Sequence, residues 1–137
     1  MDISPVLAAP YRLIIALRNW GYDRGILPTI KTDALVVSVG NIESGGTGKT
    51  PFTIALAGAL KRRGHSVAIV TRGYKGRLKG PVRVSLSHSA AEVGDEPLLM
   101  ARSTGLPVIK SPDRVAGADY ARRNLGADLV VLDDGFQ

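Results

Sequence analysis

A glycine-rich segment with one lysine, GNIESGGTGKTP at residues 40–51, is the first stretch of this sequence that could do chemistry. Glycine N–H groups can turn inward around phosphate oxygens, Lys49 can reach the β- and γ-phosphates, and Thr50 can hold Mg²⁺ through its hydroxyl. An apolar run precedes the segment and a helical pattern follows it, which favours a phosphate-binding loop over a glycine-rich turn with an incidental lysine. The predicted phosphate-binding residues are Glu43, Ser44, Gly45, Gly46, Thr47, Gly48, Lys49 and Thr50.

This loop departs from the usual pattern G-x-x-x-x-G-K-[ST] at its first position, where the chain has Glu43. Its glycines instead lie in the order GG-x-GK-T, which resembles a variant class of phosphate-binding loops. We therefore expect a nucleotide site with a variant loop.

Two carboxylates follow the apolar run of LVVLDDG near the end of the chain. Asp133 and Asp134 come directly after the predicted strand, so they should lie at the carboxyl edge of the sheet, where they could hold Mg²⁺ or its water shell opposite Thr50. A strand that ends in Asp and Gly can also be a simple turn. The phosphate-binding loop elsewhere in the chain favours the metal interpretation.

A second acidic pair, Asp95 and Glu96, lies in VGDEP. Acidic residues are common in the first turn of a helix, where they complement the helix dipole. They could instead supply the general base that activates a hydroxyl nucleophile in phosphoryl transfer to an alcohol. The residues alone leave both interpretations open.

Basic and aromatic side chains follow two further strands. Arg72 and Tyr74, in TRGYKGR, come after a predicted strand and should share an edge with the phosphate-binding loop. Arg114, in SPDR, is expected in the first turn of a helix, where a cation is disfavoured by the dipole. Arginine at such places suits a phosphate on the nucleotide or on the acceptor, although an ordinary surface arginine is the alternative for Arg114.

The elements that must position these residues alternate along the chain. Apolar runs predict strands, and the segments between them have helical patterns and end signals; for example, KRRGH ends one helix with basic side chains and a glycine. Ser111 is expected to cap the last helix, with Pro112 at its first position. Such alternation predicts an α/β fold with a mostly parallel sheet covered on both faces. Strands are expected at 35–39, 67–71, 82–86, 107–110 and 128–135, and helices at 5–22, from 50, at 96–103 and from 111.

Composition limits the function classes. The 137 residues suffice for one modest core, the net charge is +6, and cysteine is absent, which excludes disulfides and thiolate metal sites. The positive charge favours anionic partners, but the arginines are spread along the chain with no aromatic residues interleaved, so we expect no nucleic-acid partner.

The segment at residues 5–22 is apolar but is interrupted by Pro10 and Arg12 and is too short to span a bilayer. Its stripe of Leu13, Ile14, Leu17 and Trp20 fits either a helix packed on a core or a helix lying on a membrane surface. The periodicity alone favours the core, because most amphipathic helices cover one.

Four motifs in order, SVGNIESGGTGKTP, TRGYKG, VGDEPLLMARSTGLPV followed by DR, and VLDDGFQ, resemble the N-terminal half of bacterial tetraacyldisaccharide 4′-kinases. The resemblance covers nearly all of residues 35–137. It implies transfer of the γ-phosphate of ATP, with Mg²⁺, to the 4′-hydroxyl of an acylated glucosamine disaccharide 1-phosphate, which gives lipid IVA in lipid A biosynthesis. It also implies that residues 1–30 form a membrane-interface helix and linker at the cytoplasmic face of the inner membrane, and that residues 31–137 form the kinase domain.

The resemblance assigns roles to the residues singled out above. Asp95 would be the catalytic base and Glu96 would assist near the metal. Lys49 would act on the phosphates, and the metal would be served by Thr50, Asp133 and Asp134. Acceptor or phosphates would be placed by Arg72, Tyr74 and Arg114.

Members of this family are about twice as long, and a histidine thought to pair with the catalytic aspartate lies in their second half. His65 and His88 match neither of the histidine positions expected there. We therefore expect a partial domain that binds nucleotide weakly and does not turn over alone. Two alternatives stay open: a regulatory P-loop ATPase or GTPase without a lipid acceptor, although no N-K-x-D guanine motif occurs, and a non-catalytic truncated product.

Overall fold

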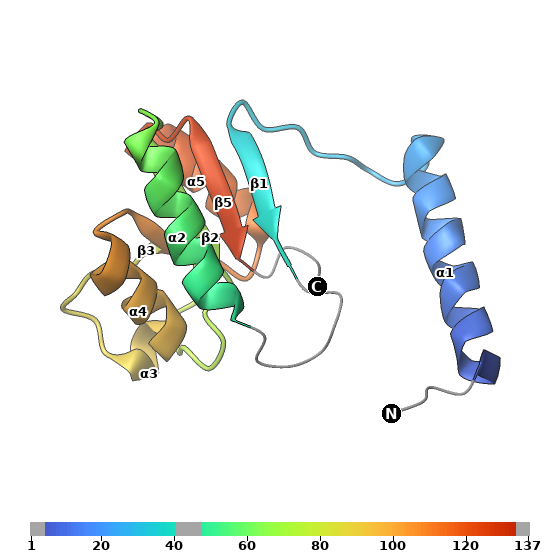
Figure 1. The fold of residues 1–137 in the computed structure, drawn as a ribbon, viewed down its shortest axis with the longest axis horizontal. Coiled ribbons are helices and arrows are strands. Elements are labelled where there is room, and N and C mark those ends of the chain that lie inside the picture. Colours follow the sequence, from blue (N-terminus) through green and yellow to red (C-terminus); the bar gives the residue numbers. More distant parts are fainter. Residues whose placement is uncertain (1–4, 41–47, 134–137) are drawn as a thin grey trace. The chain divides into compact units, whose positions relative to one another are not determined.

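The computed structural model of the protein describes residues 5–40 and 48–133. The chain divides into two compact units, Met1–Lys31 and Thr32–Gln137. The first unit contains helix α1 (Pro5–Asp23), and the second contains the sheet with its helices (Figure 1).

Four strands of the second unit run parallel: β1 (Leu35–Val39), β5 (Leu129–Asp133), β2 (Val67–Thr71) and β4 (Val108–Lys110). A short strand, β3 (Val82–Arg83), pairs antiparallel with β4 and completes the order β1-β5-β2-β4-β3. The central strand β2 is buried along its whole length, as expected of a Val- and Ile-rich strand covered on both faces. The predicted α/β fold with a mostly parallel sheet is confirmed.

Helices cover both faces of this sheet. α2 (Lys49–Arg62) and α4 (Asp95–Thr104) lie on one face, whereas α5 (Arg114–Leu125) lies on the other (Figure 1). Alternate residues of β2 enter the two cores, because successive side chains of a strand point to opposite faces. Val67 and Ile69 belong to the cluster under α2 and α4, and Ala68 and Val70 belong to the cluster under α5.

The structure corrects two local predictions. The strand expected at 82–86 extends only over Val82–Arg83, and the segment after it turns into a one-turn helix, α3 (Ala90–Val93), that the sequence pattern did not predict. The last helix is not capped by Ser111 with Pro112 at its first position; its N-cap is Asp113, whose carboxylate accepts hydrogen bonds from the N–H groups of Val115 and Ala116 at 2.9 and 3.1 Å.

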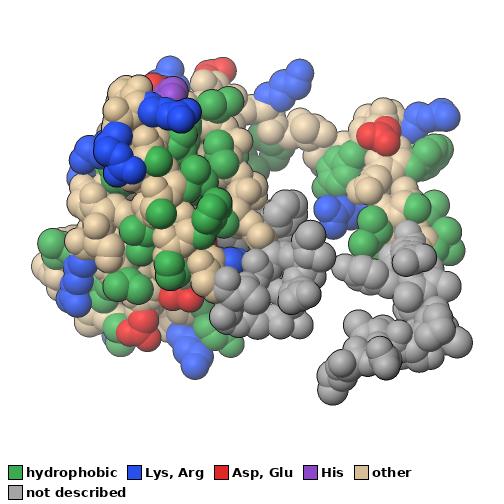
Figure 2. Space-filling view, in the orientation of Figure 1, with side chains coloured by type: hydrophobic (Ala, Val, Ile, Leu, Met, Phe, Trp, Pro, Cys, Tyr) green, Lys and Arg blue, Asp and Glu red, His purple; other side chains and the backbone are tan. Residues whose placement is uncertain are grey.

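The N-terminal unit exposes large apolar side chains on α1. Leu13, Ile14, Leu17 and Trp20 are each at least half exposed. Figure 2 shows hydrophobic and basic side chains next to one another on this unit. In the part of the chain that the structure describes, no helix is both long enough and apolar enough to cross a bilayer.

Candidate functional site

The four parallel strands end at the same edge of the sheet, and the segments that follow them carry most of the predicted site residues (Figure 1). The phosphate-binding loop follows β1, Arg72 follows β2, and Arg114 lies four residues after the end of β4. Asp133 is the last residue of β5. Ligands of open parallel sheets bind at this edge, so the topology supports one site there.

A cleft of about 460 Å³ opens after the end of β2. Four of the predicted residues line it together, namely Arg72, Tyr74, Asp95 and Glu96. The other lining residues are Thr71, Gly73 and Lys75. Two segments that are separate in the sequence therefore bring an acidic pair beside an arginine and a tyrosine, as a site for a hydroxyl acceptor and its phosphate would need.

Asp95 and Glu96 reach the cleft because α4 begins at Asp95. The residue before it, Gly94, has a φ of 98° and separates α3 from α4. Both carboxylates are exposed and lie in the first turn, where the helix dipole favours negative charge. A place in the first turn of a helix is therefore compatible with a role as general base, since both residues start α4 and also line the cleft.

The start of α2 supplies the described part of the phosphate-binding loop. Gly48 is the N-cap in the left-handed conformation, with a φ of 79°, and Lys49 and Thr50 form the first turn. The first N–H groups of a helix point out of its N-terminus and favour an anion there. The predicted loop residues Glu43, Ser44, Gly45, Gly46 and Thr47, and the predicted metal residue Asp134, lie outside the described residues.

Asp133 is buried and is held by a residue that the sequence reasoning missed. The hydroxyl of Thr53 donates to Asp133 Oδ1 over 2.9 Å, and both side chains are buried. Thr53 lies three residues after Thr50 on α2, so it is on the helix face that a P-loop threonine also uses. Helical spacing could have placed Thr53 on that face, but it gives no sign of the contact with Asp133, which is 80 residues away in the chain.

The residues at this edge fit a magnesium ion. Among residues 5–40 and 48–133, no group of three or more His, Cys, Asp or Glu side chains could hold a metal by itself. Mg²⁺ in nucleotide sites does not need such a cage, because one or two protein oxygens, water and the substrate phosphates complete its shell. The Thr50 hydroxyl and the Asp133 carboxylate offer protein oxygens of that kind.

Arg114 begins α5 and is half-buried. It lies in the first turn of the helix, as predicted, but it is not among the described residues that line the cleft. The structure therefore brings Arg72 and Tyr74 to the acidic pair, whereas Arg114 does not line the cleft with them.

A second residue missed by sequence reasoning is Lys110, the last residue of β4. It is 2% exposed, and its ammonium donates to the carbonyl of Gly76 at 2.7 Å and to that of Leu78. Burial lowers the pKa of Lys110, because the charged form loses its hydration. Nothing in the run PVIK distinguishes this lysine from one that simply ends a strand.

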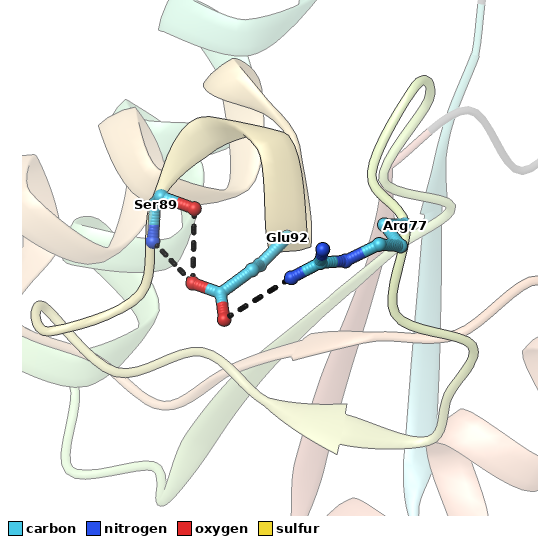
Figure 3. Close-up of polar contacts among 3 residues, drawn as sticks. All are labelled: Arg77, Ser89 and Glu92. Carbon is cyan, nitrogen blue, oxygen red and sulfur yellow. Dashed lines mark hydrogen bonds and ion pairs between the residues drawn. The ribbon is translucent and has the colours of Figure 1, made fainter.

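The loop after β2 is also tied to α3 (Figure 3). Glu92 closes a capping box with Ser89, whose N–H and hydroxyl both donate to Oε2, and its Oε1 lies 3.8 Å from Arg77 Nη2. The hydrogen bond from the Ser89 backbone is the main cause of a lowered pKa of Glu92. The contact joins the segment that follows the cleft loop to the helix that precedes Asp95.

Comparison with known proteins identifies the family. The model of the LpxK family, described as tetraacyldisaccharide-1-P 4′-kinase, matches residues 3–137. The chain belongs to this family. The resemblance found in the sequence motifs is thereby confirmed.

Relatives in the family include the tetraacyldisaccharide 4′-kinases of Syntrophus aciditrophicus, 45% identical over 93% of this chain, and of Anaeromyxobacter sp. (strain K), 48% identical over 98% of it. The chain spans 36% and 37% of their lengths. A crystal structure of LpxK from Aquifex aeolicus in complex with ATP is 43% identical, with a TM-score of 0.81, and the match covers 96% of this chain and 42% of that one. The fold is therefore that of an LpxK, and this chain spans less than half the length of its relatives.

Proposed function

We propose that this chain is the nucleotide-binding and base-bearing part of a tetraacyldisaccharide 4′-kinase, which transfers the γ-phosphate of ATP to the 4′-hydroxyl of an acylated glucosamine disaccharide 1-phosphate. The observation that carries the proposal is the cleft in which Asp95 and Glu96 lie with Arg72 and Tyr74, at the sheet edge where the phosphate-binding loop also ends. Membership of the family and the Aquifex relative in complex with ATP support the choice of reaction and nucleotide.

The reaction needs a base, a phosphate clamp and a dipole. Asp95 accepts the proton of the sugar hydroxyl as its oxygen bonds to the γ-phosphorus. The bond from the γ-phosphorus to the β,γ-bridging oxygen breaks, and ADP leaves with that oxygen. Lys49 and the N-terminus of α2 stabilise the negative charge on the β- and γ-phosphates.

The remaining cleft residues orient the acceptor. The Arg72 guanidinium suits a phosphate of the acceptor or of ATP, and Tyr74, 79% exposed at the cleft, offers a ring face and a hydroxyl to a sugar. We assign Arg114 a similar role toward phosphate at the start of α5. These groups hold the hydroxyl oxygen near the base and the phosphorus, which is where most of the rate enhancement of phosphoryl transfer arises.

Magnesium is the metal that we propose for this site. When bound, it would neutralise charge on the transferred phosphate. Thr50 and Asp133 would hold it, together with Asp134 and the ATP phosphates, and Glu96 would lie near it. The hydrogen bond from Thr53 to Asp133 would help to hold the carboxylate in this role.

The N-terminal unit suits the location of a lipid acceptor. Its exposed apolar side chains and its arginines, Arg18 and Arg24, are the two features of a helix that lies on an anionic membrane surface. We propose that α1 binds the cytoplasmic face of the inner membrane, peripherally, and brings the cleft to its substrate.

The test measures phosphate transfer from γ-labelled ATP to acylated disaccharide 1-phosphate in detergent micelles. It uses this chain and a longer form that continues to the length of the relatives. In the longer form, Asp95→Asn should lower kcat by about 10²- to 10⁴-fold with little change in ATP affinity. The matched control is Asp119→Asn, because Asp119 lies on α5 and pairs with Arg123.

Three results would count against the proposal. Transfer by Asp95→Asn at the wild-type rate would remove Asp95 as the base. ATP hydrolysis that is equally fast with and without the lipid would replace the kinase with a regulatory NTPase. Normal turnover by this chain alone would contradict the expectation that it binds nucleotide weakly and needs the longer form.

A further inference from the structure

The cleft has two walls, one formed by Thr71–Lys75 and the other by Asp95 and Glu96. The buried side chain of Lys110 packs along the first wall. A Cβ placed on Gly73 would lie 2.4 Å from Lys110 Cγ, and one on Gly76 would lie 2.7 Å from Lys110 Nζ. The loop 72–78 therefore folds directly around this lysine. Its ammonium donates to the Gly76 and Leu78 carbonyls, which fixes the far end of the loop.

From there, backbone hydrogen bonds continue to α3. The N–H groups of Arg77 and Leu78 donate to the carbonyls of Ala91 and Glu92, each over 2.8 Å. The carbonyls that accept from Lys110 therefore belong to the same short segment whose N–H groups bond to α3. Gly76 also packs against the backbone of Val93, because a Cβ on Gly76 would lie 2.5 Å from the Val93 carbonyl carbon. Any displacement of the loop end would carry α3 with it.

The last contact in this series joins the first wall to the residue directly before Asp95. A Cβ on Gly94 would lie 2.9 Å from the carbonyl oxygen of Tyr74, so the residue directly before Asp95 packs against the backbone of the other wall. Its φ of 98° makes a side chain doubly unsuitable there. The separation of Asp95 from Arg72 and Tyr74 is therefore set by the loop, α3 and Gly94 together.

We infer that Lys110 is a positioning residue for the phosphoryl transfer: through the Gly76 and Leu78 carbonyls it sets the position of the Arg72–Tyr74 wall relative to Asp95. The inference rests on the proposed function for its effect on the reaction. Lys110 does not line the cleft, so it acts through the loop rather than by touching the acceptor or ATP. An apolar side chain would fill the same core volume but would leave two carbonyls without their donor.

The first test needs no catalysis. In Lys110→Met of this chain, amide hydrogen exchange of Arg77, Leu78 and Gly94 should speed up by about 10- to 100-fold. The first two amides join the loop end to α3, and the Gly94 amide donates to the carbonyl of Ala90 within α3, which the loop end holds. The amide of Ile69, which donates to Pro107 within the sheet, should keep its protection. Lys79→Met is the matched control, since Lys79 is an exposed lysine directly after the loop 72–78.

A chemical rescue separates the ammonium from packing. The chain has no cysteine, so Lys110→Cys can be alkylated with 2-bromoethylamine in denaturant and refolded, which restores an amine at nearly the lysine length. The rescued chain should regain the wild-type exchange rates. In the longer form, Lys110→Met should lower kcat about 10-fold or more while the Kd for ATP changes by less than about twofold.

The outcomes separate this inference from the proposed function. Unchanged exchange at all three amides would overturn it, as would an equal loss of protection at Ile69, which would make Lys110 a general core residue. Wild-type kcat in Lys110→Met, with wild-type transfer intact, would overturn the effect on the reaction. Absence of transfer by the wild-type longer form would refute the proposed function instead, and the exchange data would still decide whether Lys110 holds the walls.

Discussion

The hydroxyl of Thr53 and the carboxylate of Asp133 meet where α2 crosses the end of β5. Both groups are buried, and removing a hydrogen-bond donor from a buried carboxylate costs free energy. The contact also connects the element that starts at the phosphate-binding loop with the strand that ends in the predicted metal ligand. One hydrogen bond therefore stabilises the fold and, in the proposed site, holds the predicted metal ligand.

Thr53→Val should lower the free energy of unfolding by about 1–3 kcal/mol, because the shape is kept while the donor to Asp133 is lost. Thr53→Ser, which keeps the hydroxyl, should lose less. Urea denaturation of the three chains at pH 7 measures the difference. A Thr53→Val chain as stable as the wild type, or less destabilised than Thr53→Ser, would contradict this role of the hydrogen bond.

At the scale of elements, α3 is a single turn that is held by its capping box and by the ion pair with Arg77 (Figure 3). Because the hydrogen bonds from Ser89 lower the pKa of Glu92, the ionised side chain is favoured in the folded chain relative to the unfolded one. The stabilisation is therefore fully present above pH 4.5, the usual value, and is lost as the pH falls through the lower folded pKa.

Glu92→Gln should remove this pH dependence. Glutamine can still accept from the Ser89 N–H in a capping box, so at low pH the two chains should approach each other in stability, whereas above pH 4.5 the wild type should be the more stable. The difference between their unfolding free energies, followed from pH 7 to pH 3, cancels the titration of the other carboxylates. A difference that does not change over this range would refute the prediction.

Sequence patterns predicted some of these elements and site residues but not others. Apolar runs predicted the central strands, and parallel strands bring the segments after them to one edge, which is why Arg72 and Tyr74 were expected to share an edge with the phosphate-binding loop. Their convergence with Asp95 was not predictable from order, because Asp95 follows the antiparallel strand β3 and α3. Neither Thr53 nor Lys110 could be found that way. Their roles arise from contacts 80 and 32 to 34 residues away in the chain, which no local pattern encodes.

The two wrong local predictions have identifiable physical reasons. Asp113 rather than Ser111 caps α5, because the Asp113 carboxylate accepts hydrogen bonds from two N–H groups at the start of the helix. Ser111 is buried, and its hydroxyl donates to the Asp113 carbonyl instead. β3 pairs with β4 over Val82 and Arg83, and a last hydrogen bond from the N–H of Val84 to the carbonyl of Val108 at 2.8 Å ends the pairing. Beyond it, Ser85 enters a turn in which its N–H donates to His88 Nδ1 at 3.0 Å.

The whole molecule combines a packed α/β unit with a separate N-terminal unit of different character. In α1, Leu17 and Trp20 are 59% and 50% exposed, and the guanidinium of Arg24 lies 5.4 Å from the Trp20 ring. A tryptophan beside arginines is suited to the boundary between headgroups and acyl chains, where its ring is buried and the cations meet anionic lipids.

Leu17→Glu with Trp20→Glu should therefore weaken binding to vesicles that contain anionic phospholipid by about 100-fold or more, since each side chain contributes about 1.5–3 kcal/mol when buried and 1.4 kcal/mol corresponds to tenfold. Leu86→Glu, at an equally exposed leucine of the other unit, should bind as the wild type does. Co-sedimentation over a range of lipid concentrations measures the affinities. Equal binding of the double variant and the wild type would show that α1 is not the membrane contact. Equal weakening by Leu86→Glu would place the contact on the α/β unit as well, and the cleft would then have to reach its lipid acceptor from that surface.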